Sequence, residues 1–271
     1  MVKPSKKYWT IGEIDATGVR GPHEVELKNI SKAKYHTFLN IDRKTLAKIV
    51  KEDLGGKFEN IGFDEDWTIT LEMFPEVNIH LSYTYYGKEF GDEIEAEFKF
   101  LFSGDRVFWV PGEDSATYID IIMDFLELKI NGEEPFEKNY EMKTELLKKV
   151  LIQRNEPFKL LTERDTEKLS SFLGAEVWKT AEGWKISRET FPEIFIEINW
   201  DIKNGLDISF SGNQLPNNIN SYHIELVGIF TINHILRYIT LQYQNKDLPE
   251  ICFIMFSRYF TKLNKWDHRR R

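Results

Sequence analysis

The stretch Trp67-Thr-Ile-Thr-Leu-Glu-Met-Phe-Pro-Glu76 recurs further along the chain as Trp184-Lys-Ile-Ser-Arg-Glu-Thr-Phe-Pro-Glu193. The two copies lie 117 residues apart, align without a gap and share six of ten residues. Two more blocks match in the same order: residues 100–104 with 208–212, and residues 54–55 with 173–174. Three matching blocks in one order indicate a tandem duplication, because self-similarity at a regular spacing is the signature of repeated units.

Within each copy, apolar and polar residues alternate on both sides of a Phe-Pro-Glu sequence. In the first copy Ile79, Leu81 and Tyr83 would face one side of a strand, with His80 and Ser82 on the other. This alternation predicts two antiparallel strands, and proline suits the turn between them because it has no N–H for a ladder. We interpret the residues at the ends of these blocks as structural repeat residues: Trp67, Phe74, Pro75, Glu76, Trp184, Phe191, Pro192 and Glu193.

Segments with apolar residues at helical spacing precede and follow these strands. Residues 42–53 carry Leu46, Ile49 and Val50 on one face and are followed by Gly55, which suits a left-handed helix end. The same reasoning predicts further elements: a third strand over 96–102, a short fourth over 107–110, and closing helices near 114–126 and 225–238.

The predicted fold class is α+β. It consists of a tandem duplication of a two-layer module (helix, antiparallel strands, helix) in a pseudo-two-fold arrangement. One face of each sheet is expected to be wet or covered by a partner. The predicted segments are an N-terminal arm (1–34), a first repeat (35–139), a connector helix (140–157), a second repeat (158–245), and a C-terminal helix with a basic tail (246–271).

The two ends of the chain carry separate expectations. In the arm, residues 9–14 and 24–27 are expected to pair as a hairpin. Residues 248–263 are apolar around most of a helical circumference, which indicates burial between modules or against a partner subunit. The basic tail from Arg258 to Arg271 would steer an acidic partner, or would be a solvated terminus.

Composition excludes several classes of protein. The chain has 271 residues, 36 basic against 44 acidic side chains, a net charge of −8 and one cysteine. One cysteine excludes an intramolecular disulfide framework and any four-cysteine metal site, and Cys252 is expected to be a buried small hydrophobe. Negative charge argues against nucleic-acid binding. No leader sequence is recognised and the apolar run 251–256 is too short for a membrane span, so a cytoplasmic protein without membrane contact is expected.

An ordered set of short motifs in the first copy resembles an uncharacterised prokaryotic family, domain of unknown function 3786. The motifs cover residues 42–130 and are Leu54-Gly55-Gly56, Phe74-Pro75, Gly91-Asp92-Glu93, Leu101-Phe102 and Pro111-Gly112-Glu113-Asp114. The second copy lacks the Gly-Asp-Glu and Pro-x-Glu-Asp motifs and resembles a degenerate duplicate. The resemblance implies no established activity. Some family members are fused to cysteine-rich iron–sulfur domains, which this chain lacks.

Acidic residues concentrate in the first copy. Carboxylates and loop carbonyls suit hard cations, so Asp92, Glu93, Glu113 and Asp114, with His80, are the candidate ligand or metal residues. The alternative is a solvated hairpin tip, with Glu113 and Asp114 as favourable charges at a helix N-terminus. No catalytic residue is predicted, because zinc-helix, nucleophile-elbow and phosphate-loop motifs are absent. No cofactor is predicted, and a divalent cation is the group that such a cluster would hold.

Two functional hypotheses follow. The first is a non-catalytic binding or assembly module that acts through protein–protein contacts, with a partner protein or with a second copy. It rests on the duplication, the richness in aromatic residues and the lack of catalytic motifs. The alternative is a metal- or small-ligand-handling protein or enzyme that uses the acidic cluster of the first repeat.

Overall fold

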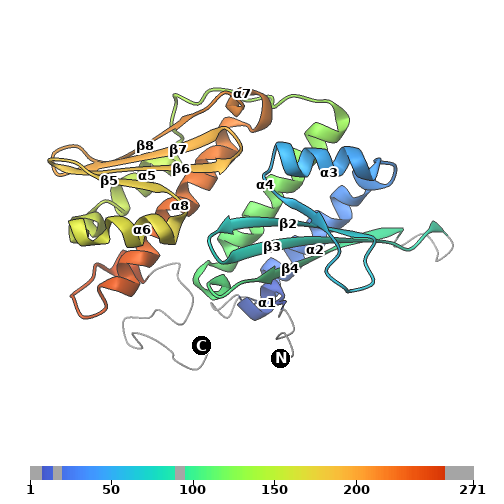
Figure 1. Ribbon diagram of the computed structural model, residues 1–271, viewed down its shortest axis with the longest axis horizontal. Coiled ribbons are helices and arrows are strands. Elements are labelled where there is room, and N and C mark those ends of the chain that lie inside the picture. The colour runs from blue at the N-terminus through green and yellow to red at the C-terminus, as the bar shows by residue number, and fades with distance from the viewer. Residues whose placement is uncertain (1–7, 15–19, 89–94, 254–271) are drawn as a thin grey trace. The chain divides into compact units, whose positions relative to one another are not determined.

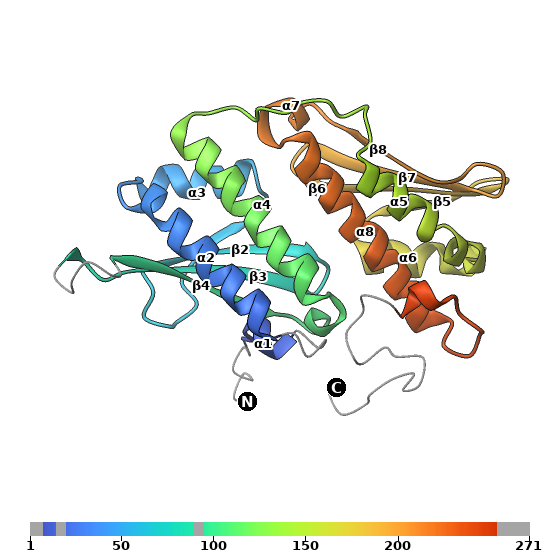
Figure 2. The ribbon, with the colours of Figure 1, turned by 180° about the vertical axis from the view of Figure 1, so that it is seen from behind.

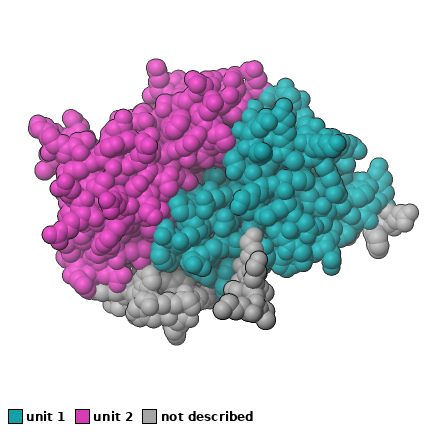
Figure 3. All heavy atoms as spheres, in the orientation of Figure 1, with its two compact units in different colours: residues 1–133 teal, residues 134–271 magenta. Residues whose placement is uncertain are grey.

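A computed structural model describes residues 8–14, 20–88 and 95–253. The chain divides into two compact units, residues 1–133 and 134–271, which are coloured separately in Figure 3. Each unit contains helices and one four-stranded antiparallel sheet, with strand orders β1-β2-β3-β4 and β5-β6-β7-β8 (Figure 1). The predicted α+β class is therefore confirmed. The pseudo-two-fold arrangement stays a prediction.

The first unit is formed by four helices and four strands. The helices are α1 (Ile11–Ile14), α2 (Arg20–Phe38), α3 (Arg43–Glu52) and α4 (Gly112–Asn131). The strands are β1 (Lys57–Glu59), β2 (Trp67–Phe74), β3 (Val77–Tyr85) and β4 (Ala96–Ser103). The predicted short fourth strand is wrong, because those residues form a 3₁₀ turn, η2 (Val107–Trp109), and the fourth strand is the unpredicted β1.

Alternation along the strands gives the first sheet one strongly apolar face. Ile69, Leu81 and Phe100 lie side by side in register on β2, β3 and β4, and each is at most 7% exposed. Helices α2 and α4 pack on each other over this face (Figure 2). The predicted pairing of β2 with β3 is confirmed, from Trp67 opposite Tyr83 to Phe74 opposite Val77.

The arm prediction is wrong, because residues 20–38 form α2 and not one side of a hairpin. Leu27, Ile30, Ser31 and Phe38 are buried at helical spacing, which places them on the face turned to the sheet. Pro22 lies in the first turn of this helix, where a missing N–H breaks no intrahelical bond.

The second unit repeats the scheme with different lengths. Its helices are α5 (Glu145–Gln153), α6 (Thr166–Leu173), α7 (Leu215–Asn218) and α8 (Ser221–Gln242), with 3₁₀ turns η3 (Glu156–Leu160), η4 (Glu163–Asp165) and η5 (Glu250–Cys252). Its strands are β5 (Glu176–Lys179), β6 (Gly183–Phe191), β7 (Ile194–Asp201) and β8 (Gly205–Ser211). Helix α5, which lies within the predicted connector helix (140–157), packs on α8 and β8 within this unit.

Helix α8 is the core helix of the second unit. It is long and apolar enough for a membrane span, but 89% of its most apolar window is buried inside the structure, as in a core helix. Beyond it the predicted C-terminal helix is represented by η5, and the remaining residues 254–271, with the basic tail, lie outside the described residues. Cys252 is 0% exposed, as the expectation of a buried small hydrophobe requires.

Both units turn the chain in the same way at Phe-Pro-Glu. Glu76 and Glu193 have left-handed backbones with φ of 67° and 58°. In each turn this glutamate donates its N–H to the carboxylate four residues earlier, at 3.3 Å for Glu72 and 2.8 Å for Glu189. Glu76 and Glu193 therefore have the same backbone conformation and the same hydrogen bond in their turns, and their interpretation as structural residues stays a prediction.

The glycine that directly follows the last strand of each unit, β4 or β8, packs against this turn. A Cβ on Gly104 would lie 2.0 Å from the Glu76 carbonyl oxygen, and one on Gly212 would lie 1.9 Å from that of Glu193. The φ angles of the two glycines are 112° and 125°, which residues with a side chain rarely adopt. This pair of glycines allows each strand end to approach the turn of its neighbour.

Substitution of Gly104 by alanine should lower the free energy of unfolding of the first unit by roughly 2–4 kcal/mol, because the new Cβ meets backbone that cannot move aside. Gly132→Ala is the control, since Gly132 also has a positive φ but no atom within 4 Å of its Cβ position. It should cost only about 1 kcal/mol. Urea denaturation measures both, and equal losses would contradict the steric explanation.

Candidate functional site

The structure describes only part of the predicted acidic cluster. Asp92 and Glu93 lie outside the described residues. Glu113 is exposed and Asp114 is buried, both in the first turn of α4. Among the described residues, no group of three or more His, Cys, Asp or Glu side chains is placed to hold a metal ion. The cation site therefore stays a prediction.

His80 is buried, although the sequence places it on a polar strand face. Its Nδ1 lies 2.8 Å from the Thr70 hydroxyl and its Nε2 lies 2.7 Å from the Ser103 hydroxyl. The Tyr8 ring packs edge-on against the imidazole, with centroids 4.9 Å apart. His80 is 0% exposed, so this hydroxyl–imidazole–hydroxyl row satisfies buried polar atoms and presents no free nitrogen at the surface.

The loop before β2 covers the sheet face on which His80 lies. The carboxylate of Glu65 accepts backbone N–H bonds from Ile61, Gly62 and Phe63, the last two at 3.1 and 2.6 Å. Burial opposes ionisation of Glu65, but these N–H groups outweigh it and hold its pKa below its usual range. The folded loop sets the Phe63 ring 5.4 Å from the Tyr8 ring, over the polar face.

The corresponding face of the second sheet is exposed to solvent, so the expected wet face is found there. Trp178 is 43% exposed, and Lys185 forms an ion pair with Glu197 at 3.0 Å. Ser187 donates to Glu197 at 3.2 Å, in the register positions that Thr70 and His80 occupy in the first unit. A tight turn joins β5 to β6, and it is too short to fold back over the sheet.

Two different groups occupy the outer edge of β4. Trp9 and Phe102 exchange backbone hydrogen bonds, each 2.8 Å long, which form an isolated bridge. Four residues earlier on β4, Phe98 donates its N–H to the Ser31 hydroxyl of α2 at 2.8 Å. Both contacts protect an edge strand that would otherwise present unpaired backbone groups.

Phe100 lies between these two contacts and has no such partner. Because backbone groups alternate in direction along a strand, its N–H and C=O point outward, like those of Phe98 and Phe102. None of the residues that the structure describes forms a hydrogen bond with these two groups of Phe100. The residue is only 7% exposed, and buried backbone groups are nearly always paired.

Phe100 lines a groove between β4 and α2, two elements that lie beside each other in Figure 2. The groove has a volume of about 280 Å³, and Thr10 and Ile11 contribute to its lining. Its walls are residues 96–100 of β4 and one side of α2: Glu24, Leu27, Lys28, Ser31, Lys32 and Tyr35. Sequence reasoning missed this groove, because it expected a hairpin where α2 lies.

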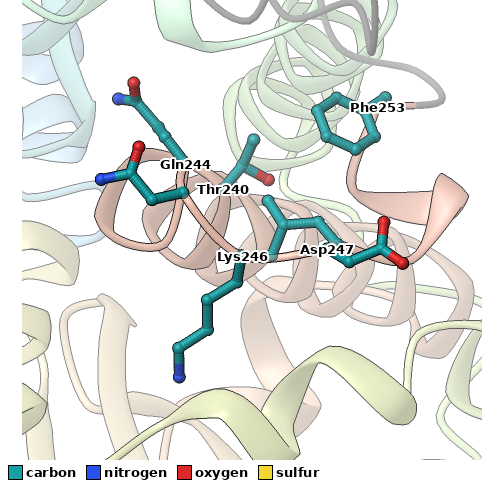
Figure 4. Close-up of a pocket in the computed structure, with 7 residues that line it drawn as sticks. Thr240, Gln244, Lys246, Asp247 and Phe253 are labelled. Atoms are coloured by element: carbon teal, nitrogen blue, oxygen red, sulfur yellow. The ribbon is translucent and has the colours of Figure 1, made fainter.

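A second hollow lies in the second unit, after α8. It has a volume of about 210 Å³, and Thr240, Leu248 and Phe253 contribute to its lining. Figure 4 shows Gln244 and Lys246 extending in opposite directions, so these polar groups do not converge on one point. The Thr240 hydroxyl is already engaged with the carbonyls of Leu236 and Cys252. The groove beside β4 is therefore the better candidate site.

A buried carboxylate organises the same end of the second unit. Asp165 accepts hydrogen bonds from the N–H and hydroxyl of Thr162, at 2.7 and 2.9 Å, and from the hydroxyls of Tyr238, at 2.9 Å, and Tyr243. Burial would raise the pKa of Asp165, but these four donors together hold it below its usual range. Asp165 is a structural residue that fastens η4 to the end of α8.

Comparison with protein-family models, with curated proteins and with solved structures finds no match for this chain. Membership of the family named above therefore stays a prediction.

Asp165→Asn should lower the free energy of unfolding at pH 7 by about 2–3 kcal/mol, because the charged acceptor of four hydrogen bonds is lost. The pKa of Asp165 is lower in the folded chain than in the unfolded chain, so its ionisation stabilises the fold at pH values above the ordinary aspartate pKa near 4. This stabilisation is lost as the pH falls through the pKa of the folded chain. The gap between variant and parent should therefore shrink below about pH 4. The exposed Asp247→Asn is the control in urea titrations, and a pH-independent gap would contradict the charge argument.

Burial raises the pKa of the Cys252 thiol to about 11. Native protein at pH 8 should therefore react with an aromatic disulfide reagent far more slowly than unfolded protein, because the thiolate is the reactive form. Absorbance of the released thiolate measures the rate with and without denaturant. Rapid reaction of the folded chain would contradict the burial of this thiol.

Proposed function

We propose that this protein is a non-catalytic binding module that captures an extended segment of a partner protein in the groove between α2 and β4. The observation that carries the proposal is that Phe100 lines this groove and that its outward N–H and C=O have no partner among the described residues. An added strand would supply both missing hydrogen bonds, as in other sheets that bind peptides by strand addition.

The chain itself provides the precedent for this mode of binding. Trp9 already pairs with Phe102 at the same edge, in antiparallel orientation. A partner strand would continue the pairing along β4 from the point where Trp9 leaves it. Apolar walls from Leu27, Phe98 and Phe100 offer contact area, and the few polar groups fix register.

The surroundings of His80 support a non-catalytic function. Catalysis needs an acid, base or nucleophile within reach of a substrate, and the row of Thr70, His80 and Ser103 is sealed beneath Tyr8. The alternative, a metal- or small-ligand-handling protein, depends on the placement of Asp92 and Glu93 and gains no support from the described residues. The negative charge of the chain favours a protein partner over nucleic acid.

We also propose that the two units arose by duplication of one module. The support is positional: the same turn, the same left-handed glutamate and the same closing glycine occur at matching registers in both units. The units then diverged in how their sheets are covered. The binding groove belongs to the first unit, where α2 has 19 residues, against nine in α5.

Selection of displayed random peptides on the full chain tests the binding proposal. Peptides of extended, β-forming sequence should be enriched, and binding should slow hydrogen exchange of the Phe100 amide at least tenfold, because that N–H becomes bonded. Exchange measured by NMR or mass spectrometry, with and without peptide, gives the result.

Lys32→Trp and Lys44→Trp form the matched pair of variants. Both replace an exposed lysine on a helix of the first unit and remove one positive charge, but only residue 32 lines the groove. The indole at position 32 should weaken binding at least tenfold by filling the groove, and the indole at position 44 should leave binding unchanged. Peptides that bind both variants equally, or that leave Phe100 exchange unaltered, would refute the proposal, as would a selection that enriches nothing.

A further inference from the structure

The α2 rim of the groove carries two exposed lysines, Lys28 and Lys32. Lys28 and Lys32 are four residues apart, so they lie on the same side of the helix, and both line the groove. Neither forms an ion pair with any residue that the structure describes. Lys34, which does not line the groove, is by contrast bound to Asp124, at 2.7 Å, and to Glu127 of α4.

The lining of the groove also contains two acidic groups, Glu97 and Glu24. Glu97 accepts a hydrogen bond of 2.5 Å from the Tyr86 hydroxyl. The side chain of Glu24 packs against Gly12 of α1, where its carboxylate would meet any Cβ. Among the described residues that line the groove, three lysines (Lys28, Lys32 and Lys99) therefore stand against two carboxylates, which leaves an excess of positive charge.

We propose that the segment bound in this groove is acidic, with carboxylate side chains that meet Lys28 and Lys32 while its backbone pairs with Phe100. This inference rests on the proposed function and specifies its partner. Alternate residues of a bound strand point to the same side. Two carboxylates at alternate positions would therefore both face the α2 rim. The whole chain carries a net charge of −8, so these two lysines form a local positive site on an otherwise acidic protein.

Two synthetic peptides as long as β4 test the inference on the full chain. Both have blocked ends and alternating valines, and they differ only in carrying aspartates or asparagines at the intervening positions. The aspartate peptide should bind about tenfold more tightly at low salt, as expected for two partly exposed ion pairs, and the advantage should fall at high salt. Fluorescence titration of labelled peptide measures both affinities.

Charge reversal on the protein separates the lysines of the groove from those elsewhere on the first unit. The double variant Lys28→Glu with Lys32→Glu should lose the preference for the aspartate peptide. A peptide with lysines in place of the aspartates should bind this double variant more tightly than it binds the parent protein. Lys44→Glu with Lys51→Glu changes the net charge equally on exposed positions of α3, outside the groove, and should keep the parent's preference. Circular dichroism of the parent and both variants establishes that each is folded.

The outcomes distinguish this inference from the function on which it rests. Equal binding of the aspartate and asparagine peptides, with Phe100 exchange slowed by both, would overturn the acidic preference and leave strand addition standing. A preference that survives reversal of Lys28 and Lys32 would also overturn it, because the charge would act elsewhere. If no peptide, acidic, neutral or selected, slows exchange at Phe100, strand addition itself fails.

Discussion

Every backbone N–H and C=O that leaves water must find a new partner, and this requirement governs the outer edge of β4 more than any other part of the molecule. Along this edge Phe102 bonds to the backbone of Trp9, Phe98 bonds to the hydroxyl of Ser31, and Phe100 has no partner among the described residues. The first two contacts hold α1 and α2 beside the strand. The groove exists because those helices are held there, and the Phe100 groups at its floor are left open by the same arrangement.

The same requirement explains how the two units differ. In the first unit the Glu65 loop and Tyr8 cover the second face of the sheet, so its polar residues must bond to one another, and Thr70, His80 and Ser103 do so. In the second unit the face is wet, and Glu197, at the position of His80, can stay charged beside Lys185. A histidine bonded through both nitrogens suits the buried position, whereas an unpaired carboxylate there would carry a large desolvation penalty.

Local pattern was enough to predict β2, β3 and their turn, because alternation and the Phe-Pro-Glu sequence act over few residues. It misled at α2, where residues 24–27 were predicted to be one side of a hairpin but belong to a helix, whose first turn tolerates Pro22. The acidic cluster was selected by composition, and composition does not say which carboxylates converge. Asp165 was missed for a related reason: its tyrosine donors are 73 and 78 residues away, and only the folded chain brings them together.

The structure also bounds how tightly a strand could bind beside α2. Trp9 and Ser31 already use the outward N–H groups of Phe102 and Phe98, so a ligand gains few backbone hydrogen bonds, each worth about 1 kcal/mol net. Ordering the ligand costs more than so few bonds return. Binding must therefore depend on side chains: apolar contact along Leu27 and Tyr35, and charge at the α2 rim. A groove of this kind selects its ligand by the residues that alternate along the strand, and exchanges it readily.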